Sequence, residues 1–166
     1  MPQGVQSQVK TMASMAAGLC LVMTAAPAFA AEPLVGLWQM ISQQIGKSQV
    51  PPDPLAIRIS EAGGALHFEY MVHLEMILQR SFTVHPDGAP GVLLDEKGSS
   101  IGIAKLNKIS ATEYTLVLQR PNRPPEPGKL KITDKGFILN CATDANVPGH
   151  GPTHIVQVFA KQTAVP

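Results

Sequence analysis

Residues 34–162 contain short runs in which apolar and polar side chains alternate. Alternation with a period of two predicts β-strands that bury one face and expose the other. In one such run, Leu66, Phe68 and Tyr70 share a face, while His67 and Glu69 share the opposite face. The runs that the pattern predicts as strands are 34–41, 55–60, 66–72, 76–84, 100–106, 114–119, 130–132, 137–142 and 155–161.

Turn-forming residues separate these runs. Glu61–Gly64 and His85–Gly88 carry turn chemistry, and Asp134–Gly136 predicts a hairpin between two strands. The segment 121–128 holds four prolines and is predicted to be a loop, as is the segment 146–151. The chain is therefore punctuated at short intervals, which suits strands better than helices.

The pattern indicates an all-β fold, because no run sustains the 3.6-residue period of an amphipathic helix. Eight or nine strands, many of them about 8 to 12 residues apart, are typical of an antiparallel sandwich or barrel. Of the two, we expect a closed barrel, with eight to nine antiparallel strands in up-and-down order. A barrel of about eight strands either fills its interior with side chains or holds one small ligand.

The first 30 residues differ from the rest of the chain. Lys10 is their only charged side chain, an apolar run extends from Met12 to Ala26, and small residues stand at Ala28 and Ala30. This arrangement predicts a secretory signal peptide that is cut after Ala30. The alternative is a membrane anchor. The apolar run has about 15 residues, however, and a membrane span needs about 20. We therefore expect a periplasmic or secreted protein without a stable membrane anchor, in which residues 31–166 form one domain.

Composition narrows the function classes. The chain has 13 basic and 12 acidic residues, and removal of Lys10 with the signal peptide leaves a neutral mature domain. A neutral domain lacks the basic footprint of a nucleic-acid-binding protein. The 45% hydrophobic content is too high for a disordered chain. Cys20 lies in the signal peptide, so Cys141 is left without a disulfide partner.

A Gly-x-Trp motif, Gly36–Trp38, stands in the first predicted strand. Lipocalin-like barrels carry such a motif in their first strand, where the Trp ring plugs the closed end. Further segments follow in the same order and spacing: Lys47-Ser48, Pro51-Pro52, 55–59, 62–64, 86–88, 103–107, 112–115, 133–136 and 158–162. Over about residues 34–162, the chain resembles a bacterial family of secreted lipocalin-like domains. The resemblance implies a calycin-type fold and a secreted location, without assigning an activity.

The first functional hypothesis is a binding protein that holds a small apolar molecule in the barrel. Such sites are concave and largely apolar, with a few polar groups that orient the ligand. The residues expected to contact the ligand are Trp38, Phe68, Tyr70, Tyr114 and Phe137. The hypothesis needs no cofactor, and it leaves the oligomeric state open.

The second hypothesis is an enzyme on the same barrel, working as an isomerase, lyase or hydratase without a cofactor. Its candidate acid and base residues are His67, Glu69 and His73, which share one strand face. The competing interpretation of this face is an ordinary solvated surface opposite the apolar one. The hypothesis therefore requires that these side chains point into a cavity.

The remaining histidines and Cys141 are weaker candidates for a functional site. His150 and His154 could approach one metal ion only with further ligands such as Cys141 or His73, so no metal site is expected. Cys141 itself is interpreted as a buried small hydrophobic residue rather than a reactive thiol.

A third hypothesis is a structural role in the cell envelope, in which the barrel fills its interior with its own side chains.

Overall fold

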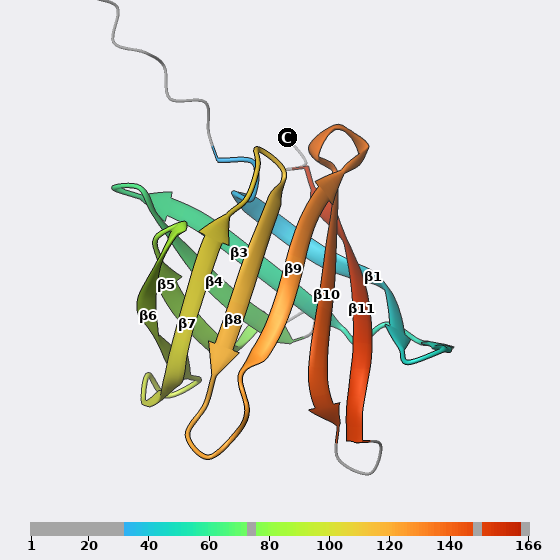
Figure 1. The fold of residues 1–166 in the computed structure, drawn as a ribbon. Helices are drawn as coiled ribbons and strands as arrows, with labels where there is room; N and C mark the ends of the chain where they lie inside the picture. The colour runs from blue at the N-terminus through green and yellow to red at the C-terminus, as the bar shows by residue number, and fades with distance from the viewer. Residues whose placement is uncertain (1–31, 73–75, 148–150, 164–166) are drawn as a thin grey trace, which may run out of the picture. The chain divides into compact units, whose positions relative to one another are not determined.

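The computed structural model describes residues 32–72, 76–147 and 151–163, and its strands form one antiparallel sheet. From β3 to β11 each strand pairs with the next, β1 pairs with β3, and β1 also pairs with β11 (Figure 1). The elements are β1 (Gly36–Ile45), β2 (Ser48–Val50), β3 (Leu55–Ala62), β4 (Ala65–Val72), β5 (Ile77–Val84), β6 (Asp87–Asp95), β7 (Ser100–Lys108), β8 (Glu113–Gln119), β9 (Glu126–Thr133), the 3₁₀ turn η1 (Asp134–Gly136), β10 (Ile138–Val147) and β11 (Gly151–Gln162).

The β1–β11 pairing closes the sheet into a barrel of ten strands, β1 and β3 to β11. The remaining strand, β2, folds back on the end of β1 and takes no part in closure. The prediction of an all-β antiparallel barrel is confirmed. The predicted number of eight or nine strands is wrong, because the described residues form eleven.

Strands β2 and β6 account for the difference. β2 has three residues, which are too few to show an alternating pattern. In β6, Gly88, Pro90 and Gly91 interrupt the alternation with residues typical of turns. The structure explains why residue 91 is a glycine. A Cβ atom at this position would overlap the backbone carbonyl oxygen of Thr83 on β5. The glycine that obscures the strand in the sequence therefore allows two backbones to approach closely.

One end of the barrel is filled by large side chains. The rings of Phe68 and Phe82 stack with their centroids 4.8 Å apart. Tyr114 and Phe159 are almost completely buried in the same hydrophobic core. Fully burying an apolar side chain of this size contributes about 1.5 to 3 kcal/mol. This end is a packed core rather than a ligand cavity.

The segment Glu32–Val35 covers the same end, and Leu34 is completely buried in the core. The indole Nε1 of Trp38 donates a hydrogen bond of 2.8 Å to the carbonyl oxygen of Leu34. The Glu32 carboxylate accepts hydrogen bonds from the Tyr114 hydroxyl and from Nζ of Lys108, the latter at 2.8 Å. Residues that precede the first strand thus close the barrel. We call this the closed end.

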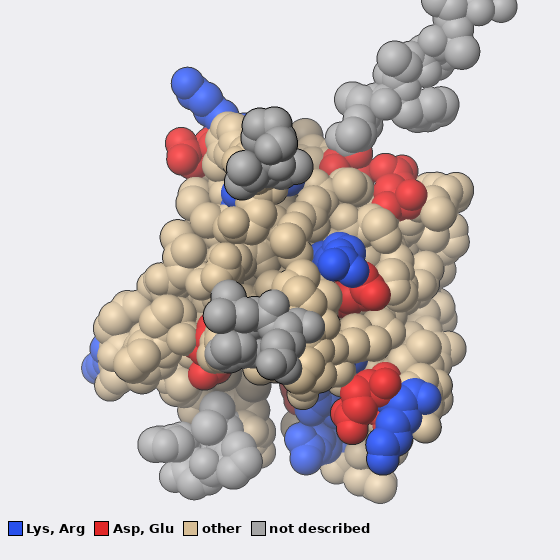
Figure 2. Space-filling model, turned by 180° about the vertical axis from the view of Figure 1, so that it is seen from behind, with Lys and Arg blue, Asp and Glu red and all other residues tan. Residues whose placement is uncertain are grey.

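The predicted signal peptide, residues 1–30, lies outside the described residues. No helix in the described part of the chain is long and apolar enough to cross a membrane. On the side of the surface opposite to the view of Figure 1, charged side chains are sparse, and acidic and basic ones lie next to one another (Figure 2).

Candidate ligand-binding site

The other end of the barrel is open, and a cavity of about 180 Å³ lies inside it. Its walls come from the inward faces of β3, β4, β5 and β8 to β11. The lining residues are Ile57, Tyr70, Arg80, Leu116, Leu118, Glu126, Gly128, Leu130, Cys141, Thr143, Ala145, Ile155 and Gln157. The cavity begins where the packed aromatic core stops.

The deeper lining is apolar or uncharged. Ile57, Leu116 and Leu130 are buried and form part of the hydrophobic core. Burial raises the pKa of Cys141 to about 12, so its thiol stays protonated at neutral pH. Burial also raises the pKa of Tyr70 to about 12, although neighbouring Arg80 opposes the shift. The inner cavity therefore offers apolar contacts and neutral polar groups.

Arg80 introduces a positive charge at the outer part of this cavity. It lies on β5 with the same inward parity as the core residues Phe82 and Val84. Its guanidinium carbon lies 4.3 Å from the centroid of the Tyr70 ring, which is a cation–π contact. Arg80 lines both the inner cavity and a second cavity of about 360 Å³. We call this second cavity the mouth cavity, and its lining residues are Leu55, Tyr70, Gln79, Arg80, Ile101 and Arg120.

Arg120 follows the last residue of β8 and brings a second guanidinium to the mouth cavity. Its Nη1 lies 3.6 Å from Oε1 of Glu126 at the start of β9. Both side chains are largely shielded from solvent, with 25% and 21% of their surface exposed. The open end therefore combines two arginines and one carboxylate beside an apolar interior.

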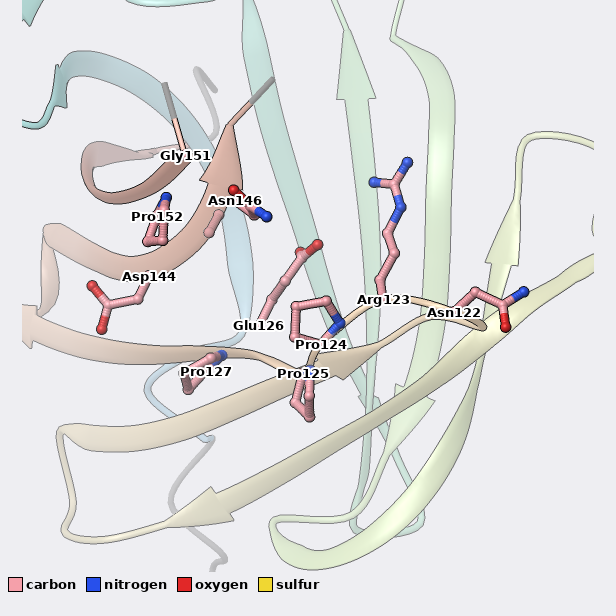
Figure 3. Close-up of a pocket in the computed structure, with 11 residues that line it drawn as sticks. Asn122, Arg123, Pro124, Pro125, Glu126, Pro127, Asp144, Asn146, Gly151 and Pro152 are labelled. Carbon is pink, nitrogen blue, oxygen red and sulfur yellow. The ribbon is translucent and has the colours of Figure 1, made fainter. Parts of the chain in front are cut away.

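A groove of about 700 Å³ borders the same end. It lies between the loop from β8 to β9 and the ends of β10 and β11 that carry Asn146 and Pro152. Glu126 and Arg123 project to the same side of that loop (Figure 3). Glu126 and Ala145 line both this groove and the inner cavity. The inner cavity thus adjoins the surface through the groove and through the mouth cavity.

Comparison with solved structures finds the same architecture. The crystal structure of the zebrafish ileal bile acid-binding protein complexed with cholic acid matches with a TM-score of 0.53 and 13% sequence identity. The match covers 78% of this chain and 99% of that chain. The chain folds as a calycin-type barrel. No protein-family model matches it, and a search of curated proteins finds no match either.

The structure places the predicted ligand-binding residues in three different parts of the calycin-type barrel. Tyr70 lines the inner cavity and the mouth cavity. Trp38, Phe68 and Tyr114 point inward but belong to the packed closed end, and none of them lines the inner cavity. Phe137 does not line the interior, and 49% of its surface is exposed. Phe137 follows η1 and has a helical backbone conformation (φ −100°, ψ −15°). It therefore precedes β10, and the alternation of inward and outward side chains in that strand does not include it.

The predicted acid–base residues lie elsewhere. His67 and Glu69 are on the outer face of β4, opposite in parity to Phe68 and Tyr70. His67 Nδ1 lies 2.9 Å from the Thr83 hydroxyl. A cross-strand ion pair of 3.3 Å joins Glu69 to Arg58. This outward placement does not provide the inward pair that the enzyme hypothesis requires.

The other histidines form no inward cluster among the described residues. His73 and His150 lie outside the described residues. The Nδ1 atom of His154 lies 2.7 Å from Oδ1 of Asp144 on the surface. Cys141 is buried inside the barrel. The described residues contain no group of three or more potential metal ligands.

Arg80, Arg120 and Glu126 line the cavities at the open end but are not among the site residues predicted from the sequence. The sequence does contain a signal for them. Arg80 has the parity of Phe82, Arg120 continues the inward series of Leu118, and Glu126 has the parity of the core residues on β9. A charged side chain in an apolar series at one end of a strand indicates either a barrel mouth or a buried polar site.

Proposed function

We propose that this protein binds a small apolar molecule inside the calycin-type barrel. The observation that carries the proposal is the 180 Å³ cavity between the packed core and the open end. A barrel with a purely structural role would fill this space with its own side chains. The lining of the cavity combines apolar side chains with a smaller number of polar ones, the mixture that is typical of small-molecule sites.

The fold neighbour supports the proposal by analogy. The zebrafish protein was crystallised as a complex with cholic acid. A fold alone does not determine function, because one barrel can host many activities. The cavity in this chain is therefore the stronger support.

A cavity-filling substitution tests the proposal. We expect an environment-sensitive apolar dye to bind the full-length chain with 1:1 stoichiometry, and apolar competitors to displace it. Cys141→Phe places a ring in the inner cavity and should abolish binding, whereas Cys141→Ala leaves the space open and should retain binding. Intrinsic Trp38 fluorescence is a poor reporter, because Trp38 lies at the closed end.

Two results would overturn the proposal. One is failure of the native protein and Cys141→Ala to bind any member of a broad apolar panel. The other is unchanged binding by a folded Cys141→Phe variant, as judged by circular dichroism and its unfolding transition. The second result would place the dye outside the barrel.

We further propose that the protein acts in the periplasm or outside the cell after cleavage following Ala30. Support comes from the charge and apolar pattern of residues 1–30. Intact-mass measurement after bacterial expression should find a chain that begins at Ala31 in the periplasmic or extracellular fraction. Recovery of only the uncleaved chain from the cytoplasm would contradict this location.

A further inference from the structure

Two arginines at the open end have hydrogen-bond donors without acceptors. Within the described part of the chain, Nε of Arg80 and Nε of Arg120 are both buried, and neither has a hydrogen-bond partner. Leaving a buried donor unpaired costs free energy, and the cost is larger for a charged group. Both guanidinium groups line the mouth cavity, so a ligand there could reach them.

The residues that line the mouth cavity include two arginines and no carboxylate. Glu126 lies 3.6 Å from Arg120, but no described carboxylate lies within 4 Å of Arg80. Asp95 is opposite Arg80 in the β5–β6 register, but its Oδ1 accepts backbone N–H groups of the β6–β7 turn. Tyr70 stays neutral at pH 7. The Nε atom of Arg80 is buried and unpaired although the residue as a whole is only partly buried, and an anion placed beside it would supply the missing acceptor.

We propose that Arg80 and Arg120 bind the carboxylate of an amphipathic ligand, whose short apolar chain enters the inner cavity past Tyr70. This inference rests on the proposed function and specifies the ligand class. Arg80 lines both cavities, so it lies where the head group of such a ligand meets its apolar chain. Guanidinium groups suit carboxylates because their planar N–H donors match the two oxygens.

The cavity volume limits the length of the apolar chain. A water molecule occupies about 30 Å³ of liquid volume. By that measure, 180 Å³ holds roughly six atoms of similar size. Affinity should therefore increase about fourfold for each methylene that enters the cavity, and it should level off once the cavity is full. A medium-chain carboxylate fits better than a long one.

Glu126 has a second role in this arrangement. Its carboxylate lies 3.6 Å from Nη1 of Arg120, where it would compete with an incoming carboxylate. Replacing Glu126 with glutamine removes the competing negative charge. Glu126→Gln should therefore bind a carboxylate ligand several times more tightly, whereas Arg80→Gln and Arg120→Gln should bind it more weakly.

Calorimetric titration of the full-length protein with octanoate, octanol and octylamine tests the head-group preference. Octanoate should bind more tightly than octanol, and octylamine should bind most weakly. Arg80→Gln should weaken octanoate binding by at least about tenfold, because hydrogen bonds to charged groups are strong. The same substitution should change octanol binding much less. A series from butanoate to dodecanoate should show the plateau.

Arg58→Gln is the matched control, because Arg58 lies on the outer face of β3 and its side chain is half exposed. It should leave octanoate binding within about twofold of the native value. Equal losses of octanoate and octanol in Arg80→Gln would overturn the carboxylate site, as would native protein that binds octanol as tightly as octanoate. Those results would leave apolar binding intact, whereas failure of all three probes and of the dye would refute the proposed function itself.

Discussion

Leu34→Ala tests whether the segment before β1 stabilises the barrel. Leu34 lies outside any strand, yet its side chain is completely buried in the core. Its carbonyl oxygen accepts the Trp38 indole hydrogen bond, and this backbone contact remains possible after the substitution. The change therefore removes side-chain packing and keeps the hydrogen-bonding groups.

The expected loss of stability is large for a residue that precedes the first strand. Replacing a buried leucine by alanine costs about 2 to 5 kcal/mol, through lost apolar burial and the cavity left behind. The unfolding entropy is about 2.1 cal/mol/K per residue, so each kcal/mol lowers the Tm of a domain of about 130 residues by about 3.7 °C. Leu34→Ala should therefore lower the Tm by about 7 to 18 °C.

Urea and thermal unfolding of the full-length chain provide the measurement. The control is Ile41→Ala on β1, where 51% of the side chain is already exposed. This control should cost less than about 1 kcal/mol, since surface substitutions have small effects. Equal, small losses in the two variants would refute the conclusion that residues 32–35 close the barrel.

Two further predictions concern buried positions. Because the pKa of Cys141 rises from 9.0 to about 12, the folded state retains its proton, and the free energy of unfolding should fall by about 1.4 kcal/mol per pH unit between pH 9 and 12. Urea titrations of Cys141→Ala across that pH range should lack this part of the pH dependence. The smaller contribution of Tyr70 above pH 10 should remain. An unchanged slope would contradict the raised pKa of Cys141. Gly91→Ala should cost about 1 to 3 kcal/mol or more, because the new Cβ meets the backbone of β5. Gly128→Ala should cost less, since its nearest contact is the Thr143 side-chain oxygen at 3.1 Å, and the reverse order of urea midpoints would count against this reasoning.

Much of the fold follows from local alternation. The turn at Gly63-Gly64 and the hairpin around η1 were predicted from their residues and are confirmed. The loop predicted over 121–128 is shorter in the structure, because β9 already begins at Glu126 despite Pro127. β6 could not be predicted, because the close approach that requires Gly91 depends on where β5 lies in space.

The binding site was harder to predict from the sequence than the fold. Tyr70 was named because it is aromatic and shares a face with apolar residues. Which end of the barrel is packed and which is open depends on how all ten strands stagger, and no single strand reveals it. Hence Trp38 and Tyr114, on the correct face, lie at the closed end, whereas Arg80, also on that face, reaches the cavity. Phe137 shows that one residue in a turn conformation is enough to move a side chain outside.

The pairing of β1 with β11 has a consequence for the order of folding. These strands come from opposite ends of the described chain, with Leu37 beside Gln162 and Ile45 beside Ile155. Contacts so distant in sequence carry a high loop-closure entropy and are associated with slow folding. Until residues 151–162 leave the ribosome, β1 and β10 each keep one unpaired edge. The barrel, and with it any cavity, can close only once residues 151–162 are free to pair with β1.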